Sequence, residues 1–427
     1  MPALARVVGL WGAVWMGLGS ILGTGVFVTL GIATGIIGAG VVLAVVLAAV
    51  VATANGLSSA QLAAAHPESG GTYEYGYAFV HPLAGFAAGL MFLAAKSASA
   101  ATAALGCSGY LLRILGLPES GITHIGLALA IILLLTALVA SGVRRSSQVN
   151  SVIVALTLAT LAAFVVFGCL SIDMSLLAER VGPATWRDAF AAPDALLHAT
   201  ALIFVAYAGY GRIATLGEEV REPARTIPSA IIITLGLSML VYVSVSATAV
   251  AVVGADAFAA ASSDVAATLV VVAQAFRHPE VARIVATGAV TALAGVLLNL
   301  LLGLSRVLLA MARRHDMPAV FCRVHAFSRS PVRAVWATGA LVAVLTLLGD
   351  VKTTWSVSAF TVLIYYGITH LAALRLPRAL RRYPTWIAIL GLMSCFGLAS
   401  FIEWQVALAG LALLGASFVV RALSLQR

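Results

Sequence analysis

Long apolar runs dominate the chain, and short polar connections separate them. Each run has roughly twenty residues, which is long enough as a helix to cross the ~30 Å hydrocarbon core of a bilayer. Apolar positions follow one another without the alternation of barrel strands, so the pattern predicts membrane-spanning helices. It predicts twelve of them, at residues 7–35, 38–65, 79–115, 122–142, 148–171, 194–217, 227–253, 281–312, 333–350, 353–376, 383–401 and 404–421.

The composition agrees with an all-α integral membrane protein and excludes an ordinary globular one. Hydrophobic residues make up 62% of the 427 positions and charged residues 10%, whereas globular domains are about a quarter charged. The apolar stretch at the N-terminus is too long for the core of a signal peptide, so we expect it to be the first span. The four cysteines lie far apart and favour neither a metal site nor a disulfide framework. We expect no metal and no organic cofactor.

The distribution of basic residues predicts the orientation of the chain. With the N-terminus inside, sixteen of the 25 Lys and Arg residues fall on cytoplasmic segments and six on the other face. The positive-inside rule then places both termini in the cytoplasm, in an inner or plasma membrane. The net charge of +9 is explained in this way, and no nucleic-acid partner is expected.

The second of the two longest external connections, 172–193 and 254–280, has a helical apolar pattern. Its apolar residues recur at spacings of three and four, which predicts a short amphipathic helix over the extracellular mouth. Such a helix could be either a gate or a structural cover. The residues are Phe258, Ala261, Val265, Leu269, Val272 and Phe276.

Glycine is unusually dense in the first span, over residues 17–25. Each glycine weakens a helix by about 1 kcal/mol. Gly19 and Gly23 could form a face on which another helix packs closely. Alternatively, the helix breaks here and offers bare amides and carbonyls to a ligand.

The sixth span is interrupted by glycine in a similar way, over residues 204–212. Two broken helices in matching positions of two halves are a sequence signature of a transporter site. They match if 1–171 and 172–380 are inverted five-span copies, with two peripheral spans in 381–427. Broken helices offer amides to a carboxylate and carbonyls to an ammonium. A free amino acid carries both groups, although other small zwitterions also fit.

Four segments resemble the amino acid–polyamine–organocation superfamily. They are GSILGTGVF in the first span, HPESGGTYEYGYAFVHPLAGFAAG after the second, GYGRIATLGEEVREPARTIPSAI around the sixth, and GLSRVLLAMARRHDMP at 303–318. The similarity covers the first ten spans in order. It implies an inverted five-helix repeat with unwound first and sixth helices, and uptake or exchange of amino acids by alternating access. It leaves the oligomeric state open.

The resemblance also implies a set of substrate contacts. The α-carboxylate would meet Ser20, Gly23, Thr24 and Gly25. The amino group would meet carbonyls of the first span and those of Tyr207, Ala208 and Gly209, and Tyr207 or Phe204 would close over the substrate. The alternative is that Ser20 and Thr24 bond back to the preceding turn and that Tyr207 belongs to the core.

Lys96 lies in the middle of the third span and is one of only two lysines in the chain. A lysine at the centre of a span costs about 2.5–3.5 kcal/mol on insertion scales, so it should face the interior of the bundle. It could carry a proton, stand in for a sodium ion or attract an anionic substrate group. A structural role, bonded to carbonyls at helix ends, is the alternative.

Positions at which this chain differs from the family pattern limit the coupling ions and the substrates to be expected. Some members use a lysine in the fifth span for proton coupling, where this chain has Thr157, so Lys96 is the candidate replacement. Residues 293–299 of the eighth span lack the hydroxyls of a family sodium site, which favours proton coupling or exchange. Gly211 stands where some polyamine carriers have a glutamate, so neutral amino acids are expected first and acidic ones second.

Arg212, which follows the break in the sixth span, is a candidate gate. It could pair with Glu68 or Glu74, or locally with Glu218 or Glu219. An intramembrane enzyme is disfavoured, because His198 and His370 have no carboxylate partners within the spans. A sensor of the same fold that binds but does not transport stays open. The sequence therefore predicts an amino acid permease, proton-coupled or exchanging.

Overall fold

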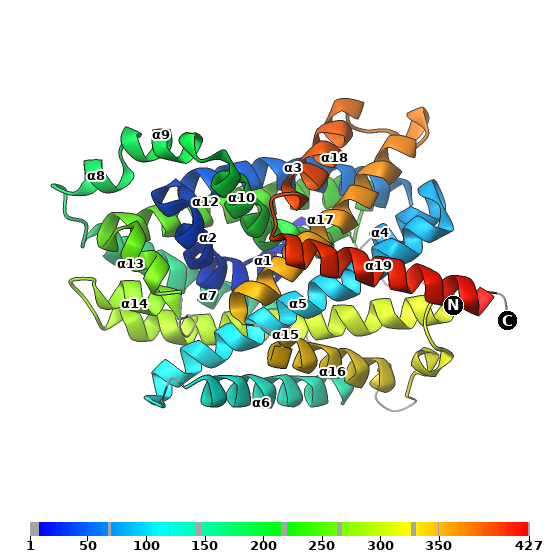
Figure 1. Ribbon diagram of the computed structural model, residues 1–427, viewed down its shortest axis with the longest axis horizontal. Helices are drawn as coiled ribbons and strands as arrows, with labels where there is room; N and C mark the ends of the chain where they lie inside the picture. The colour runs from blue at the N-terminus through cyan, green and yellow to red at the C-terminus, as the bar shows by residue number, and fades with distance from the viewer. Residues whose placement is uncertain are drawn as a thin grey trace.

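The computed structural model describes residues 8–66, 70–118, 120–141, 147–214, 220–262, 267–325, 330–348 and 350–425. Regular structure in these residues is helical, apart from one isolated bridge between Val8 and Val220. Most long helices lie side by side along the long axis of the molecule (Figure 1). The predicted all-α fold is therefore confirmed.

A helix or a pair of helices occupies each predicted span. In chain order they are α1 (Leu10–Ile21) with α2 (Leu30–Ile37), α3 (Val41–Ala65), α5 (Pro82–Leu115), α6 (Gly121–Ala140), α7 (Ser147–Cys169), α10 (Pro193–Tyr207) with α11 (Gly211–Ala214), α12 (Pro223–Val253), α15 (Val281–Arg313), α16 (Val332–Leu348), α17 (Val351–Arg375), α18 (Thr385–Ala399) and α19 (Trp404–Leu425). The predicted boundaries agree to within a few residues.

Length and apolar composition make this a multi-pass membrane protein. Eight stretches of the described chain are long and apolar enough to cross a bilayer, and the first of them, Leu10–Ala65, contains α1, α2 and α3. The helix α16 is shorter, and α18 and α19 pass only as a pair bent by 114°. The count of twelve separate crossings stays a prediction.

Helices five spans apart pack against each other. The second span, α3, contacts the seventh, α12, while α5 contacts α15 and α6 contacts α16. Glycines make two of these approaches possible, because a Cβ on Gly56 would lie 2.7 Å from Ile231 and one on Gly339 would lie 2.5 Å from Thr136. Two halves related by a two-fold axis would produce this matched pairing.

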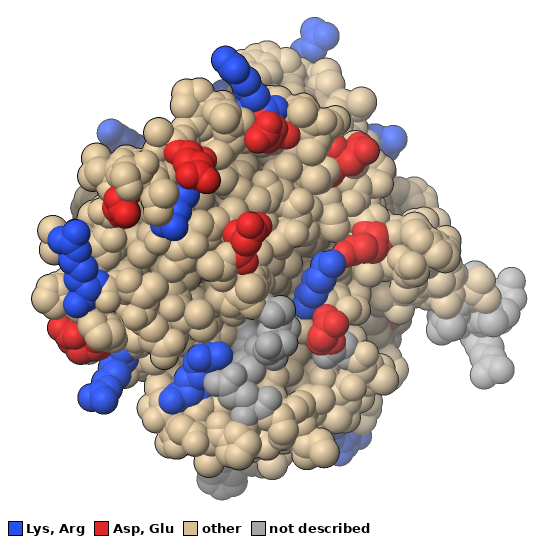
Figure 2. Space-filling view, turned by 60° about the vertical axis from the view of Figure 1, so that its left-hand side comes forward, with Lys and Arg blue, Asp and Glu red and all other residues tan. Residues whose placement is uncertain are grey.

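The two longest connections predicted to be external lie at the left-hand end of Figure 1, where α8 (Leu177–Val181), α9 (Pro183–Ala191), α13 (Ala255–Ala260) and α14 (Thr268–Gln274) are drawn. Figure 2 brings this side forward and shows basic and acidic side chains interspersed over a mostly uncharged surface. Charges of both signs are expected on an end that meets water.

The amphipathic helix predicted for 254–280 is instead two short helices, α13 and α14. Ala261 lies in the turn that follows α13, and Val265 lies outside the described residues. The expected apolar face is present, because four of the predicted residues are buried: Phe258, Leu269, Val272 and Phe276.

A polar network ties the opposite end together, and we call it the clasp. It joins the segment α4–η3 (Thr72–Tyr75 and Gly76–Val80) to the chain after α15 and to α19. Asp316 accepts hydrogen bonds from Tyr73, at 2.8 Å, and from Tyr77. Arg421 forms an ion pair with Asp316 at 3.0 Å and donates to Tyr77 at 2.8 Å.

A second ion pair, between Arg314 and Glu74, completes the clasp. The Arg314 guanidinium also lies 4.8 Å from the centre of the Tyr77 ring, within cation–π range. Burial and the hydrogen bond to Asp316 raise the pKa of Tyr77 to about 12, so at neutral pH this phenol stays protonated and donates. The clasp thus holds α4–η3, α15 and α19 together through charge-assisted bonds.

The substitution Asp316→Asn should destabilise the protein by about 2 to 3 kcal/mol, because it removes the carboxylate that forms the ion pair with Arg421 in a largely buried place. Thermal unfolding of the detergent-solubilised protein measures the effect. The control is Asp173→Asn, which removes an exposed carboxylate bonded to Ser175 in its own loop. Equal melting temperatures for the two variants would contradict the importance of the clasp.

Candidate functional site

The first span is interrupted where the sequence predicts a break. The helix α1 ends at Ile21, Leu22 is extended with φ −77° and ψ 95°, and the chain resumes as the π-helical turn η1 (Gly25–Thr29). Facing it, the sixth span tightens after α10 into the 3-10 turn η4 (Ala208–Tyr210) before α11. Both interruptions fall on the glycine-rich stretches, and η4 contacts α1.

Glycine is required here because the two broken segments touch. A Cβ on Gly209 would lie 2.3 Å from the carbonyl oxygen of Ser20, and one on Gly25 would lie 2.5 Å from Cβ of Ala206. One on Gly23 would lie 2.5 Å from Val296. Close packing and a helix break, the two interpretations of these glycines, are therefore both present: the packing brings the two breaks together.

Tyrosine hydroxyls bond to carbonyls at the interruptions. Tyr242 shares its hydroxyl between the carbonyls of Ile21, at 2.9 Å, and Ala206, at 3.3 Å. Tyr366 donates to the carbonyl of Ala208 at 3.1 Å. At the other end of a break, the first amides of a resumed helix have no intrahelical acceptor, and the helix dipole makes that end positive.

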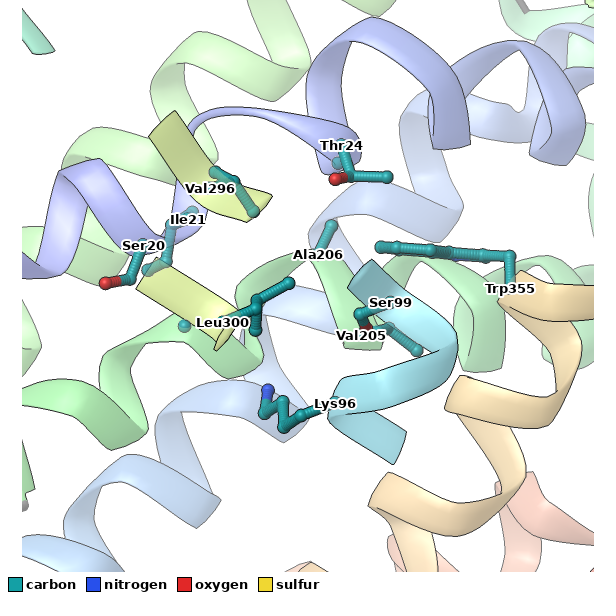
Figure 3. A pocket seen from close by; sticks show the side chains of 12 residues that line it. Ser20, Ile21, Thr24, Lys96, Ser99, Val205, Ala206, Val296, Leu300 and Trp355 are labelled. Carbon is teal, nitrogen blue, oxygen red and sulfur yellow. The ribbon is translucent and has the colours of Figure 1, made fainter. Parts of the chain in front are cut away.

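A cavity of about 30 Å³ lies beside the two breaks (Figure 3). Five of the predicted site residues line it, and they come from the first, third and sixth spans: Ser20, Thr24, Gly25, Lys96 and Gly209. A water needs roughly 10–15 Å³ by this kind of measure. The cavity therefore has room for two or three waters, and an amino acid requires its walls to move apart.

The hydroxyls of Ser20 and Thr24, both predicted to contact the substrate, differ in their hydrogen bonds. Ser20 donates to the carbonyl of Met16 at 3.0 Å, which is the back-bonded alternative. The Thr24 side chain is buried, and its hydroxyl has no hydrogen-bond partner within the described parts of the chain. A buried hydroxyl without a partner is costly. Thr24 therefore offers a bonding position to whatever enters the cavity.

Lys96 is partly buried and lines the cavity from α5. Figure 3 shows its side chain at the cavity, across from Thr24. No residue that the structure describes provides its Nζ with a hydrogen-bond or ion-pair partner. This position agrees with the prediction that Lys96 faces the interior of the bundle. Its ammonium is available to a ligand.

Four of the predicted contacts do not line the cavity in this structure: Gly23, Phe204, Tyr207 and Ala208. Phe204 is fully buried against Tyr366, with ring centres 5.8 Å apart. Tyr207 packs on Tyr242 and donates to the carbonyl of Val45 at 3.4 Å. The aromatic wall of the cavity comes instead from Trp355 of the tenth span.

Seven lining residues were not predicted from the sequence: Ile21, Ser99, Val205, Ala206, Val296, Leu300 and Trp355. A signal for Trp355 was present, because this tryptophan stands among Ser and Thr residues in the first turns of an apolar span. None of the twelve lining residues is Asp or Glu. The wall therefore offers no anion to a cationic substrate.

The gate expected at Arg212 stays a prediction. Arg212 lies in α11, just beyond η4. Glu74 forms an ion pair with Arg314, and the other expected partners, Glu68, Glu218 and Glu219, lie outside the described residues.

A second, larger hollow of about 620 Å³ lies toward the end that carries α13 and α14. Its wall includes Leu105, Ser262 and Val351. A hydroxyl pair between Thr102 and Thr354, 2.9 Å apart, joins α5 to α17 between this hollow and the cavity. The cavity and the hollow thus follow one another along the same two helices.

Residues 8–422 match the sequence model of the family described as "Amino acid permease". The chain belongs to the amino acid permease family. This match confirms the resemblance to the amino acid–polyamine–organocation superfamily. It identifies a membrane transporter rather than an enzyme.

Named relatives agree on the transporter class and differ in substrate. This permease is 38% identical to an uncharacterized transporter of Mycobacterium tuberculosis, over 99% of this chain and 93% of the relative. It is 28% identical to the branched-chain amino acid permease of Bacillus subtilis, over 80% and 75%. It is 29% identical to human cationic amino acid transporter 4, over 79% and 54%.

The substitution Gly209→Ala should lower substrate binding and uptake at least tenfold, because its Cβ would push η4 away from the Ser20 carbonyl. The matched control is Gly236→Ala on α12, where a Cβ meets nothing within 4 Å. Uptake by proteoliposomes, with the folded fraction checked by size-exclusion chromatography, measures both variants. Similar uptake by the two would show that the contact between the breaks is dispensable.

Proposed function

We propose that this permease moves neutral amino acids across an inner or plasma membrane by alternating access, coupled to protons through Lys96. One observation carries the proposal: an ammonium and a hydroxyl that have no partner among the described residues line the cavity at which two broken helices meet. These groups suit a small zwitterion, and the family supplies the amino acid.

The polar groups of the substrate would bind at the breaks. The carboxylate would lie at the first amides of the helix that resumes at Thr24, where the dipole favours an anion. The Thr24 hydroxyl would donate to it. The amino group would lie toward the carbonyls on the far side of the break, next to Gly209. A carbonyl accepts two hydrogen bonds, so the bond from Tyr366 leaves capacity at Ala208.

Lys96 would link substrate binding to proton binding. An ammonium away from water and without a counter-ion costs free energy, and a carboxylate nearby lowers that cost. Protonated Lys96 therefore favours the occupied site, and an occupied site favours protonated Lys96. Release of both on the other side of the membrane would complete the cycle.

A neutral substrate agrees best with the cavity wall. A cationic side chain would need an acidic partner, and the twelve lining residues include none. The name of the Bacillus subtilis branched-chain relative supports an aliphatic substrate, whereas that of the cationic transporters does not. An acidic substrate, drawn by Lys96, is the second candidate.

The arrangement of the helices supports alternating access. Packing of α3 on α12, α5 on α15 and α6 on α16 is what an inverted repeat of 1–171 and 172–380 would produce. The hollow would form the external approach, and the clasp would close the cytoplasmic end. The excess of basic residues on the predicted inner segments supports cytoplasmic termini.

The test is uptake by purified protein in liposomes, with labelled valine, glutamate and lysine and an imposed pH gradient. We expect gradient-driven accumulation of valine, and at least a tenfold loss of it in Lys96→Met. The chain has only one other lysine, Lys352, which is 58% exposed and lies near Glu403. Lys352→Met is therefore the matched control and should retain accumulation.

Other results of the uptake experiment would point to a different function or to a different role for Lys96. Valine uptake that ignores the gradient and requires internal amino acid would identify an exchanger. Binding of valine without uptake would identify a sensor. Preferred uptake of glutamate that is lost in Lys96→Met would assign the lysine to substrate recognition. No binding of any amino acid would overturn the proposed substrate class.

A further inference from the structure

The cavity has two kinds of wall. On the side of the breaks, the two spans approach closely: Gly209 lies against the Ser20 carbonyl, and Gly25 lies against Cβ of Ala206, too closely for any added carbon. The side chains that line this wall are small or of medium size: Ser20, Ile21, Thr24, Val205 and Ala206. On the side of α17, one large side chain, Trp355, forms the wall.

Trp355 is the largest residue that lines the cavity and the only aromatic one among the twelve. The side chain is 2% exposed, and Figure 3 shows the indole extending toward the space between Thr24 and Ser99. Its Nε1 donates to the carbonyl of Leu202 in α10 at 2.9 Å. This bond fixes the plane of the ring.

The helix that carries Trp355 is fastened on both sides of it. One turn toward the cytoplasmic end, Ser358 bonds to Ser99 at 2.7 Å. Next to Trp355 in sequence, Thr354 bonds to Thr102 at 2.9 Å. Both bonds join α17 to α5. The indole is therefore held from its own helix as well as through its N–H, and it cannot easily yield to a larger ligand.

The rest of the wall determines which part of a substrate meets the indole. The polar groups at the breaks would hold the carboxylate and the amino group, so the side chain points away from them. The wall there includes the apolar side chains of Leu300 and Trp355, with Ser99 and Lys96 beside them. On that side, the indole limits the length of the substrate side chain that fits.

We propose that Trp355 sets the largest side chain that the permease accepts, so that aliphatic amino acids of the size of valine enter and aromatic ones are excluded. This proposal rests on the proposed function, since it concerns the same cavity. A wall that is one or two methylenes too close rejects a ligand by about 10- to 200-fold per methylene. Shortening Trp355 should admit larger substrates.

The test compares uptake of labelled valine and phenylalanine by liposomes that contain wild type, Trp355→Leu or Trp355→Phe. We expect wild type to prefer valine and Trp355→Leu to raise the ratio of phenylalanine to valine uptake at least tenfold. Trp355→Phe keeps an aromatic ring but loses the bond to Leu202, and it should give a smaller rise. Trp336→Ala is the control, because Trp336 is 43% exposed on α16.

Trp355→Phe also keeps the proposal testable if the leucine variant does not fold, because it still fills most of the volume. Equal loss of valine and phenylalanine uptake in the folded variants would make Trp355 a structural residue and overturn the proposal. So would a wild type that takes up phenylalanine as well as valine. These results leave the proposed function intact, whereas a wild type that binds no amino acid removes both.

Discussion

The whole arrangement depends on one constraint: a backbone group in the hydrocarbon core must find a partner within the protein. An unbroken helix meets this requirement by itself, and a broken one does not. In this permease the interruptions of the first and sixth spans face each other in the interior, where tyrosine hydroxyls reach their carbonyls. Tyr242 bonds to Ile21 and Ala206, and Tyr366 bonds to Ala208. These bonds stabilise the breaks but satisfy carbonyls only, because a hydroxyl that donates reaches acceptors. The amide end of the resumed first helix is thus the side of the break that is suited to an anionic group.

The close approach of the breaks also explains why the cavity is small. Glycine allows Gly209 to lie against Ser20 and Gly25 to lie against Ala206, so the two helices meet with almost no side chain between them. Enlargement at these two contacts requires relative motion of the broken helices, since neither glycine has a side chain to rotate. A site that opens in this way responds to movement of backbone segments, which is the kind of motion that alternating access requires.

Local patterns predicted much of this, and long-range contacts account for what they did not predict. The apolar runs gave the helices to within a few residues, and the glycines marked both interruptions, because each signal lies within a single span. Phe204 and Tyr207 were expected at the cavity from the family resemblance, yet both are turned into the core. Trp355 takes the place of the expected aromatic from a span about 150 residues further along the chain, and its bond to Leu202 has no counterpart in any local pattern. The division of 254–280 into α13 and α14 was likewise not visible in the apolar spacing, which is continuous across both helices.

The two residues that would select the substrate lie on other helices than the breaks, although Trp355 is also bonded to Leu202 in the broken sixth span. Lys96 belongs to α5 and Trp355 to α17, and two hydroxyl pairs fasten these helices together. The same α5 packs along α15, whose end is held by the clasp through Asp316 and Arg421. The groups that would bind the substrate backbone belong to α1, η1 and η4. Motion of the broken first span against α5 and α17 would therefore change the distance from Thr24 to Lys96 and to Trp355 together. Lys96 and Trp355 would then meet the substrate, and respond to its charge and its size, only when the cavity closes. Binding of a fitting substrate and closure around it would become one step.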